Sequence, residues 1–225
     1  MAIYAIGDIH GSINALKTIF NQGLIKKDDK VIFLGDYVDK GTDSKAVIDW
    51  LIEKSKVFDF KFIRGNHEIM MTTAKSSPDI FVEWLQYYGG ATTLKSYAIS
   101  DNKNWSDKID KTHWDFIDSC LPYFEIGDFI FVHAGLEKNK RLEQQNEHHL
   151  FWKKFETPLI YNPTKTVICG HTSRKNGEIA DFKHTICIDT FAHGGMWLTS
   201  LNVETGEFLK ANNKGEIEKG KLKRT

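Results

Sequence analysis

The stretch "VIFLGDYVDKG", residues 31–41, takes the chain directly from an apolar run into a loop with three charged side chains. Asp36 and Asp39 stand three residues apart between glycines, and Lys40 follows the second carboxylate. Residues 31–34 read as a buried strand, and carboxylates at the end of such a strand are costly unless their charge is compensated. The stretch therefore predicts a core strand that ends in a site where positive charge is bound.

The flanking segments repeat this arrangement, with helices between the strands. Residues 2–6 and 58–63 are further apolar strands, each followed by a glycine-containing loop. A helix is expected after an N-cap at Ser12, and a second around residues 46–51, because apolar residues recur there at helical spacing. The resulting βαβαβ order implies a parallel sheet over the first third of the chain.

The rest of the chain changes pattern twice. Residues 78–118 look helical and are rich in aromatic side chains, which either pack a helical layer or form a wall of a substrate site. Short strands follow at 123–126 and 129–132, around a Gly127–Asp128 hairpin turn, and again at 167–169, 185–188 and 196–203. We expect a single domain over residues 1–210 and a polar, basic, solvated C-terminal tail over 211–225.

Composition narrows the class of protein. With 225 residues, 41% hydrophobic and 27% charged, the chain is long enough to bury a sizeable core and has an ordinary globular balance. The formal net charge of +0 gives no global attraction to nucleic acid or acidic lipid, so neither partner is expected. No apolar run approaches the roughly 18 residues of a membrane span, and the N-terminus lacks a signal-peptide pattern. Three cysteines without a CxxC pair fit a reducing cytoplasm. The oligomeric state is left open.

Five strand ends carry side chains that bind hard or borderline metal cations. "GDIHG" (7–11) presents Asp8 and His10 on one face of an extended segment, since alternate residues share a face. Carboxyl ends of parallel strands meet in one crevice, and carboxylate, imidazole and amide oxygen donors suit manganese, iron or zinc. The other four motifs are GDYVDKG, "RGNHE" (64–68), "FVHAG" (131–135) and "ICGHT" (168–172), which add Asp36, Asn66, His67, His133 and His171. One such motif is weak evidence, whereas five in one chain predict a metal site.

In this order the five motifs resemble the signature of the phosphoprotein phosphatase family of calcineurin-like metallophosphoesterases. "WLQYYGGATTLKSY" (84–97) further resembles bacterial serine/threonine protein phosphatases, and the likeness continues through residues 188–207. The resemblance implies an α/β fold, a four-layer α/β/β/α sandwich with two mixed sheets. Because motifs from both ends of the chain would build one site, it also implies one metallophosphoesterase domain.

The resemblance implies two divalent ions, manganese or else iron or zinc, and a role for each residue. The implied metal ligands are Asp8, His10, Asp36, Asn66, His133 and His171. Asp36 would bridge the two ions, and a hydroxide between them would attack phosphorus directly. His67 would protonate the leaving group, and Asp39 would orient its ring.

The phosphate itself is expected to contact Arg64, Lys40 and Lys154. Here the chain departs from the pattern, because the second motif of the family usually ends Asp-Arg-Gly and bacterial members carry an arginine where "LFWKKF" has Lys154. Lysine keeps the positive charge but lacks the planar fork of arginine. His193, in "AHGG", is a further candidate at the mouth of the pocket.

Three other functions were weighed against this one. A cysteine-dependent phosphatase needs a Cys-x5-Arg loop, and Cys169 has Lys175 at that spacing. A catalytically inactive scaffold would be expected to lack His67, Asp39 or a ligand, and none is missing. A symmetrical diadenosine tetraphosphate hydrolase shares the scaffold and stays the alternative, although such enzymes tend to carry glutamine where this chain has His10. The sequence thus predicts a metal-dependent phosphatase of phosphate monoesters, chiefly phosphoserine and phosphothreonine in phosphoproteins or phosphopeptides, with phosphotyrosine also considered.

Overall fold

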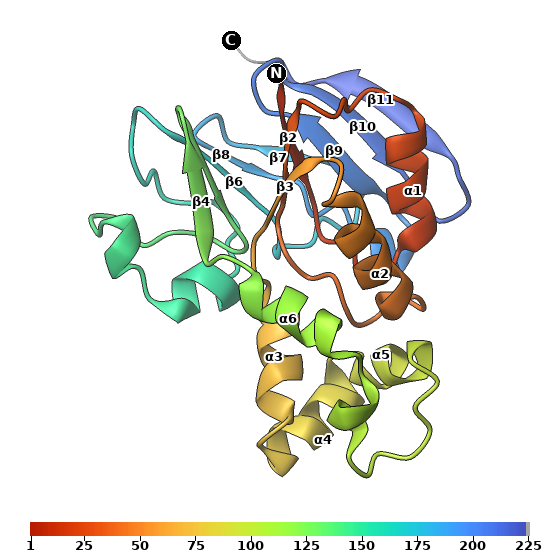
Figure 1. The fold of residues 1–225 in the computed structure, drawn as a ribbon. Coiled ribbons are helices and arrows are strands. Elements are labelled where there is room, and N and C mark those ends of the chain that lie inside the picture. Colours follow the sequence, from red (N-terminus) through yellow and green to blue (C-terminus); the bar gives the residue numbers. More distant parts are fainter. Residues whose placement is uncertain (224–225) are drawn as a thin grey trace.

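A computed structural model describes residues 1–223 as two facing β-sheets with helices outside them (Figure 1). The first sheet has six strands in the order β11-β10-β9-β1-β2-β3. Its members are β1 (Ile3–Ile6), β2 (Lys30–Phe33), β3 (Asp59–Phe62), β9 (Leu198–Asn202), β10 (Glu207–Ala211) and β11 (Ile217–Lys221). Strands β1, β2 and β3 are parallel, as the βαβαβ reading predicted, and β9 joins β1 in the antiparallel sense.

The second sheet has five strands in the order β4-β5-β6-β8-β7. Its members are β4 (Tyr123–Ile126), β5 (Phe129–Val132), β6 (Thr166–Cys169), β7 (Ala180–Asp181) and β8 (Thr185–Cys187). Strands β4 and β5 form the predicted hairpin, and β5, β6 and β8 run parallel. Both sheets are therefore mixed, which confirms the expected fold class.

Alternation along the strands creates the layers. In β2 and the residue after it, Val31 and Phe33 pack on the helical side, whereas Ile32 and Leu34 face the second sheet. This two-residue period lets one strand serve two cores. Helices α1 (Ile13–Asn21) and α2 (Ser44–Lys54) cover the outer face of the first sheet (Figure 1). The outer face of the second sheet is covered by residues 135–161, which contain only short helical turns at Leu142–Gln144 and His148–Trp152.

The aromatic middle of the chain forms a separate helical layer at one end of the sheets (Figure 1). It contains α3 (Asn66–Ala74), α4 (Pro78–Tyr87), α5 (Gly90–Ser96), a 3₁₀ turn at Trp105–Lys108 and α6 (Lys111–Ser119). Trp84, Trp105 and Trp114 are buried and pack against each other in sequence, so most of these aromatics serve the core. Tyr88 instead lines a cavity at the sheet ends. Most of the segment is therefore a packed helical layer, and one aromatic side chain forms part of a cavity wall.

The expected C-terminal tail forms a strand and a turn over much of its length, and its side chains are largely exposed. Residues 217–221 form the edge strand β11, which pairs antiparallel with β10 from Ala211↔Ile217 to Glu207↔Lys221. The Asn212 side chain closes the connecting turn by accepting from the backbone N–H groups of Lys214 and Glu216, and Gly215 adopts φ +82. An asparagine–glycine turn beside an unpaired strand edge is a hairpin signal that overall polarity concealed. Residues 224–225 of the tail lie outside the described chain.

Within residues 1–223, no helix combines the length and apolarity needed to cross a bilayer.

Candidate metal and phosphate site

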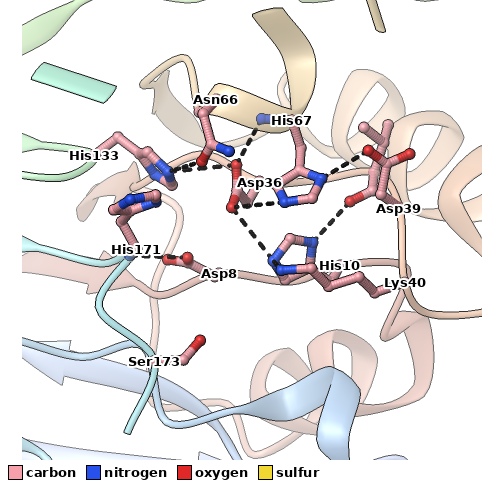
Figure 2. Close-up of polar contacts among 12 residues, drawn as sticks. Asp8, His10, Asp36, Asp39, Lys40, Asn66, His67, His133, His171 and Ser173 are labelled. Carbon is pink, nitrogen blue, oxygen red and sulfur yellow. Dashed lines mark hydrogen bonds and ion pairs between the residues drawn. The ribbon is translucent and has the colours of Figure 1, made fainter. Parts of the chain in front are cut away.

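A cavity of about 360 Å³ opens where the carboxyl ends of strands from both sheets meet. The side chains that surround it point toward one another from loops far apart in the sequence (Figure 2). Its lining residues are Asp8, His10, Asp36, Lys40, Asn66, His67, Tyr88, Trp152, Lys154, His171, Ser173 and Asp189. His133 lies fully buried behind Asn66, 2.9 Å from its side-chain oxygen. The structure thus brings all six expected metal ligands together.

Backbone partners determine which ring nitrogen donates a hydrogen bond in two of these histidines. The Nδ1 of His10 lies 2.8 Å from the Val38 carbonyl, and the Nδ1 of His133 lies 2.8 Å from the Leu34 carbonyl. A carbonyl only accepts, so each Nδ1 must donate, and in the neutral ring Nε2 then carries a lone pair. Those Nε2 atoms face opposite oxygens of Asp36 at 3.3 and 3.4 Å. Burial lowers the pKa of His133, which favours its neutral ring.

His171 and Asp8 present lone pairs in the same way. The Nε2 of His171 donates to the Trp152 carbonyl at 2.9 Å, which leaves Nδ1 as the free acceptor. Burial lowers the pKa of His171 to about 3, so this ring is neutral at ordinary pH. Asp8 accepts from the His171 backbone N–H through Oδ2, whereas its buried Oδ1 has no hydrogen-bond partner. Gly170 allows that approach, since a Cβ there would lie 1.9 Å from Oδ1.

These facing acceptors need a cation between them. Burial, and then the charges of Asp189 and Asp36, raise the pKa of Asp8 well above its usual range. Donor atoms of His10, Asp36 and His67 lie within 4.8 Å of one another, as do those of Asp36, His133 and His171. Carboxylates, neutral imidazoles and an amide oxygen grouped around a shared aspartate suit two hard or borderline divalent ions. The donor set therefore fits a dinuclear metal centre.

Glu68 holds the Asp36 loop in position. Its buried carboxylate accepts from four backbone N–H groups, those of Gly65, Asp36, Tyr37 and Val38. Glu68 thus anchors the Asp36 loop and caps the N-terminus of α3. Burial and the neighbouring Asp36 raise the pKa of Glu68 to about 7, because the two carboxylates are held close together.

Asp39 and His67 form a second buried unit beside the ligands. The Nδ1 of His67 lies 2.7 Å from Oδ2 of Asp39, and its Nε2 points toward Asp36 at 3.9 Å (Figure 2). The indole N–H of Trp84 donates to the same Oδ2 at 2.8 Å, and the Thr93 hydroxyl donates to Oδ1 at 2.6 Å. Asp39 is thus fixed by donors from α4 and α5, and the His67 ring is fixed in turn.

The backbone at the site adopts conformations that non-glycine residues seldom use. His10, Asp36, Asp39, Lys40 and His171 all have positive φ, between 44 and 71. Each such residue costs on the order of 1–3 kcal/mol, and such strain clusters where side chains must be aimed at a ligand. Five such residues lie at or beside one cavity, which supports it as the candidate functional site.

Of the three expected phosphate contacts, two lie in the cavity and one lies outside it. Lys40 lines the cavity, with its Nζ 3.2 Å from Nε2 of His10, and Lys154 lines the same cavity. Arg64 does not join them, because its guanidinium donates to the carbonyls of Ile117 and Asp118 and lines a different pocket. The Ile117 carbonyl also accepts from the Cys120 backbone N–H, so the end of α6 supplies the acceptors for this guanidinium.

Several cavity residues were not predicted. Asp189 is buried and accepts from the Ser173 hydroxyl and from the Phe191 backbone N–H. It directly follows a strand, as Asp36 does, and that shared position is the signal that would have found it. Ser173 and Trp152 carry no comparable signal in the sequence. His193 packs edge-on against the His10 ring at 4.7 Å but is not part of the cavity lining.

The fold and the donor set together define a metallophosphoesterase. The chain belongs to the calcineurin-like phosphoesterase family, whose model matches residues 1–209.

Two curated relatives share part of the sequence. A PP2A-like serine/threonine-protein phosphatase, PPG1, of Saccharomyces cerevisiae is 31% identical over 140 residues, which cover 61% of this chain and 33% of the relative. The PPG1 protein of Candida albicans is 34% identical over 153 residues, which cover 63% of this chain and 31% of the relative. The chain therefore spans about a third of the length of these relatives.

Solved structures share the fold at low identity. A protein described as a putative diadenosine tetraphosphatase has a TM-score of 0.68 at 17% identity, over 99% of this chain and 94% of that one. A cold-active protein-tyrosine phosphatase of a psychrophilic Shewanella has a TM-score of 0.67 at 13% identity, covering 96% and 79%. A serine/threonine phosphatase of Saccharomyces cerevisiae reaches 0.60 at 16% identity, covering 100% and 81%. These likenesses concern the fold alone.

Proposed function

We propose that this protein hydrolyses phosphate monoesters with a dinuclear metal centre, and that its main substrates are phosphoserine and phosphothreonine in proteins, with phosphotyrosine as a further substrate. The observation that carries the proposal is the set of inward-facing lone pairs around Asp36. His10 and His133 both aim an acceptor nitrogen at this carboxylate, and Asp8 adds an oxygen with no hydrogen-bond donor. Cations bound between these donors would offset the cost of burying them.

Each ligand has an assigned place. Asp8, His10 and Asp36 would hold one ion; Asp36, Asn66, His133 and His171 would hold the other, with manganese preferred over iron or zinc. When bound, such ions supply an activated water and neutralise phosphate oxygens.

His67 is the proposed general acid. Its Nδ1 donates to Asp39, and in the imidazolium that this carboxylate would stabilise, Nε2 also carries a proton, the one that the leaving alkoxide needs. Lys40 and Lys154 are the proposed phosphate contacts. With Nε2 of His10 holding a cation, the Lys40 ammonium would lose this acceptor and would be available to a phosphate oxygen. Arg64 has no part in this assignment.

The choice of phosphoproteins over nucleotides is supported by the two PPG1 relatives, which are described as serine/threonine-protein phosphatases. Diadenosine tetraphosphate is the competing substrate, because one structural neighbour is described as a putative diadenosine tetraphosphatase.

The deciding experiment supplies manganese to metal-stripped protein and compares phosphoserine, phosphothreonine and phosphotyrosine peptides with diadenosine tetraphosphate and p-nitrophenyl phosphate. We expect no hydrolysis without metal and the highest kcat/KM on phosphoserine or phosphothreonine peptides. Full activity of the stripped protein would refute the metal centre, and a higher kcat/KM on diadenosine tetraphosphate would refute the substrate class.

A further inference from the structure

A second, more apolar cavity of about 430 Å³ adjoins the metal and phosphate site. It lies between the loop at residues 135–138, the segment 153–161 and the outer face of the second sheet, where Val167 and Thr185 form its floor. Lys154 lines both cavities, so they meet at a proposed phosphate contact. We call this second cavity the side groove.

The side groove combines an apolar surface with charged and polar side chains. Leu136, Pro158, Leu159 and Val167 contribute to the apolar surface, with Phe155 and Tyr161 alongside. Leu159 is 66% exposed and its neighbour Ile160 is 48% exposed, which is unusual for large apolar side chains. Exposed apolar side chains gathered at the rim of a cavity indicate a surface that is covered when a ligand binds.

The charge around the side groove is positive and largely uncompensated. Among residues 1–223, Lys138, Lys153 and Lys154 form no ion pair. Glu137, the acidic residue of the lining, is already occupied by Lys140 at 2.9 Å and by His149 at 3.6 Å. A ligand that covers this groove should therefore be apolar at its centre and acidic at its ends, with the phosphate at the end near Lys154.

We propose that the side groove binds the residues flanking the phosphorylated residue of a phosphopeptide and selects a bulky apolar side chain there, with acidic residues beyond it. The proposal rests on the proposed function and specifies its substrate class. A volume of about 430 Å³ corresponds to a length of roughly 7–8 Å, or about two residues of extended chain at about 3.3 Å each. The apolar surface formed by Leu136, Leu159 and Val167 favours a leucine-like side chain.

The test uses manganese-loaded full-length protein and pairs of phosphoserine peptides, identical except that one flanking position holds leucine or serine. Pairs are made for each of the first three positions on either side, because extended chain reaches the groove within that distance. We expect about a tenfold higher kcat/KM for leucine at one of these positions, consistent with burying most of one leucine side chain. A preference below twofold at every position, with peptides still hydrolysed, would refute the groove and leave the proposed function standing.

Variants of the protein then test whether the side groove causes the preference for leucine. Leu159→Ser should reduce it to within twofold while leaving p-nitrophenyl phosphate hydrolysis unchanged, since that substrate is too small to span both cavities. Leu24→Ser is the matched control, because Leu24 is 44% exposed and lines neither cavity. Lys138→Glu should lower kcat/KM severalfold for acidic peptides and leave kcat/KM for neutral peptides unchanged.

A Leu159→Ser variant that keeps the preference for leucine would overturn the assignment of the groove. Loss of activity on diadenosine tetraphosphate alone would assign the groove to a nucleotide instead. Hydrolysis of p-nitrophenyl phosphate but of no peptide would refute the proposed function itself, and this inference with it.

Discussion

Replacing Thr93 by valine should impair the proposed general acid without touching a metal ligand. Thr93 lies on α5, and its hydroxyl donates to Oδ1 of Asp39 at 2.6 Å while accepting from the Asp39 backbone N–H at 2.9 Å. Valine keeps the branched shape but removes both bonds. Asp39 retains the Trp84 indole and His67 on its other oxygen, so its carboxylate should rotate rather than leave the site.

The size of the effect follows from the lost bond to a charged acceptor. Such bonds are worth about 1.5–3 kcal/mol, and the free energy of unfolding should fall by a similar amount. If all of that energy is needed to orient His67, kcat on an alkyl phosphate such as phosphoserine falls by roughly 10- to 150-fold, at 1.36 kcal/mol per tenfold. Aryl phosphates need less protonation of the leaving group, so their loss should stay below about threefold.

The assay measures kcat on a phosphoserine peptide and on p-nitrophenyl phosphate, together with bound manganese and urea denaturation. Thr93→Ser is the matched control, because it keeps the hydroxyl and should restore most of the peptide rate. Equal losses on both substrates, a loss of manganese, or a serine variant as impaired as valine would show that Thr93 does not act through Asp39 and His67.

Variants at three further positions probe the rest of the site. His67→Asn should reduce the rate on alkyl phosphates by roughly 10²–10⁴-fold and on aryl phosphates less, with bound metal retained; loss of metal would make His67 a ligand instead. Lys40→Ala should lower kcat/KM by roughly 10- to 150-fold, whereas Lys40→Arg should keep most activity because its fork also binds phosphate oxygens. A near-normal Lys40→Ala enzyme, or one that loses rate only in step with its metals, would remove Lys40 from phosphate binding. Glu68→Gln should turn an amide NH₂ toward two of the four backbone N–H groups that now donate to Glu68. The free energy of unfolding should fall by about 2–6 kcal/mol, because two buried donors lose their acceptor. Chemical denaturation measures this change, and an unchanged midpoint would contradict the anchoring role.

The main strands and the polar side chains at their ends could be read from the sequence because both depend on local pattern. Apolar runs of period two define the strands, and the polar residues directly after them are carried to the sheet edge wherever the strand goes. Asp8, Asp36 and His171 therefore converge in the structure as expected. The same rule applied to the strand before Asp189 would have added that residue.

Other features depend on partners far away in the chain, and only the tertiary structure decided them. Asp39 is held by Trp84 and Thr93, which are 45 and 54 residues away, and nothing near Asp39 indicates this. Arg64 was expected at the phosphate, but two carbonyls at the end of α6, 53 and 54 residues further on, accept from its guanidinium. The polar segment 217–221 became a strand because β10 offered it an edge. A sequence determines where the backbone can bend and which side chains leave a strand end, since those are local preferences. Which buried donor satisfies which buried acceptor is decided by the packing of the whole chain, because each polar group takes the partner that folding brings within reach.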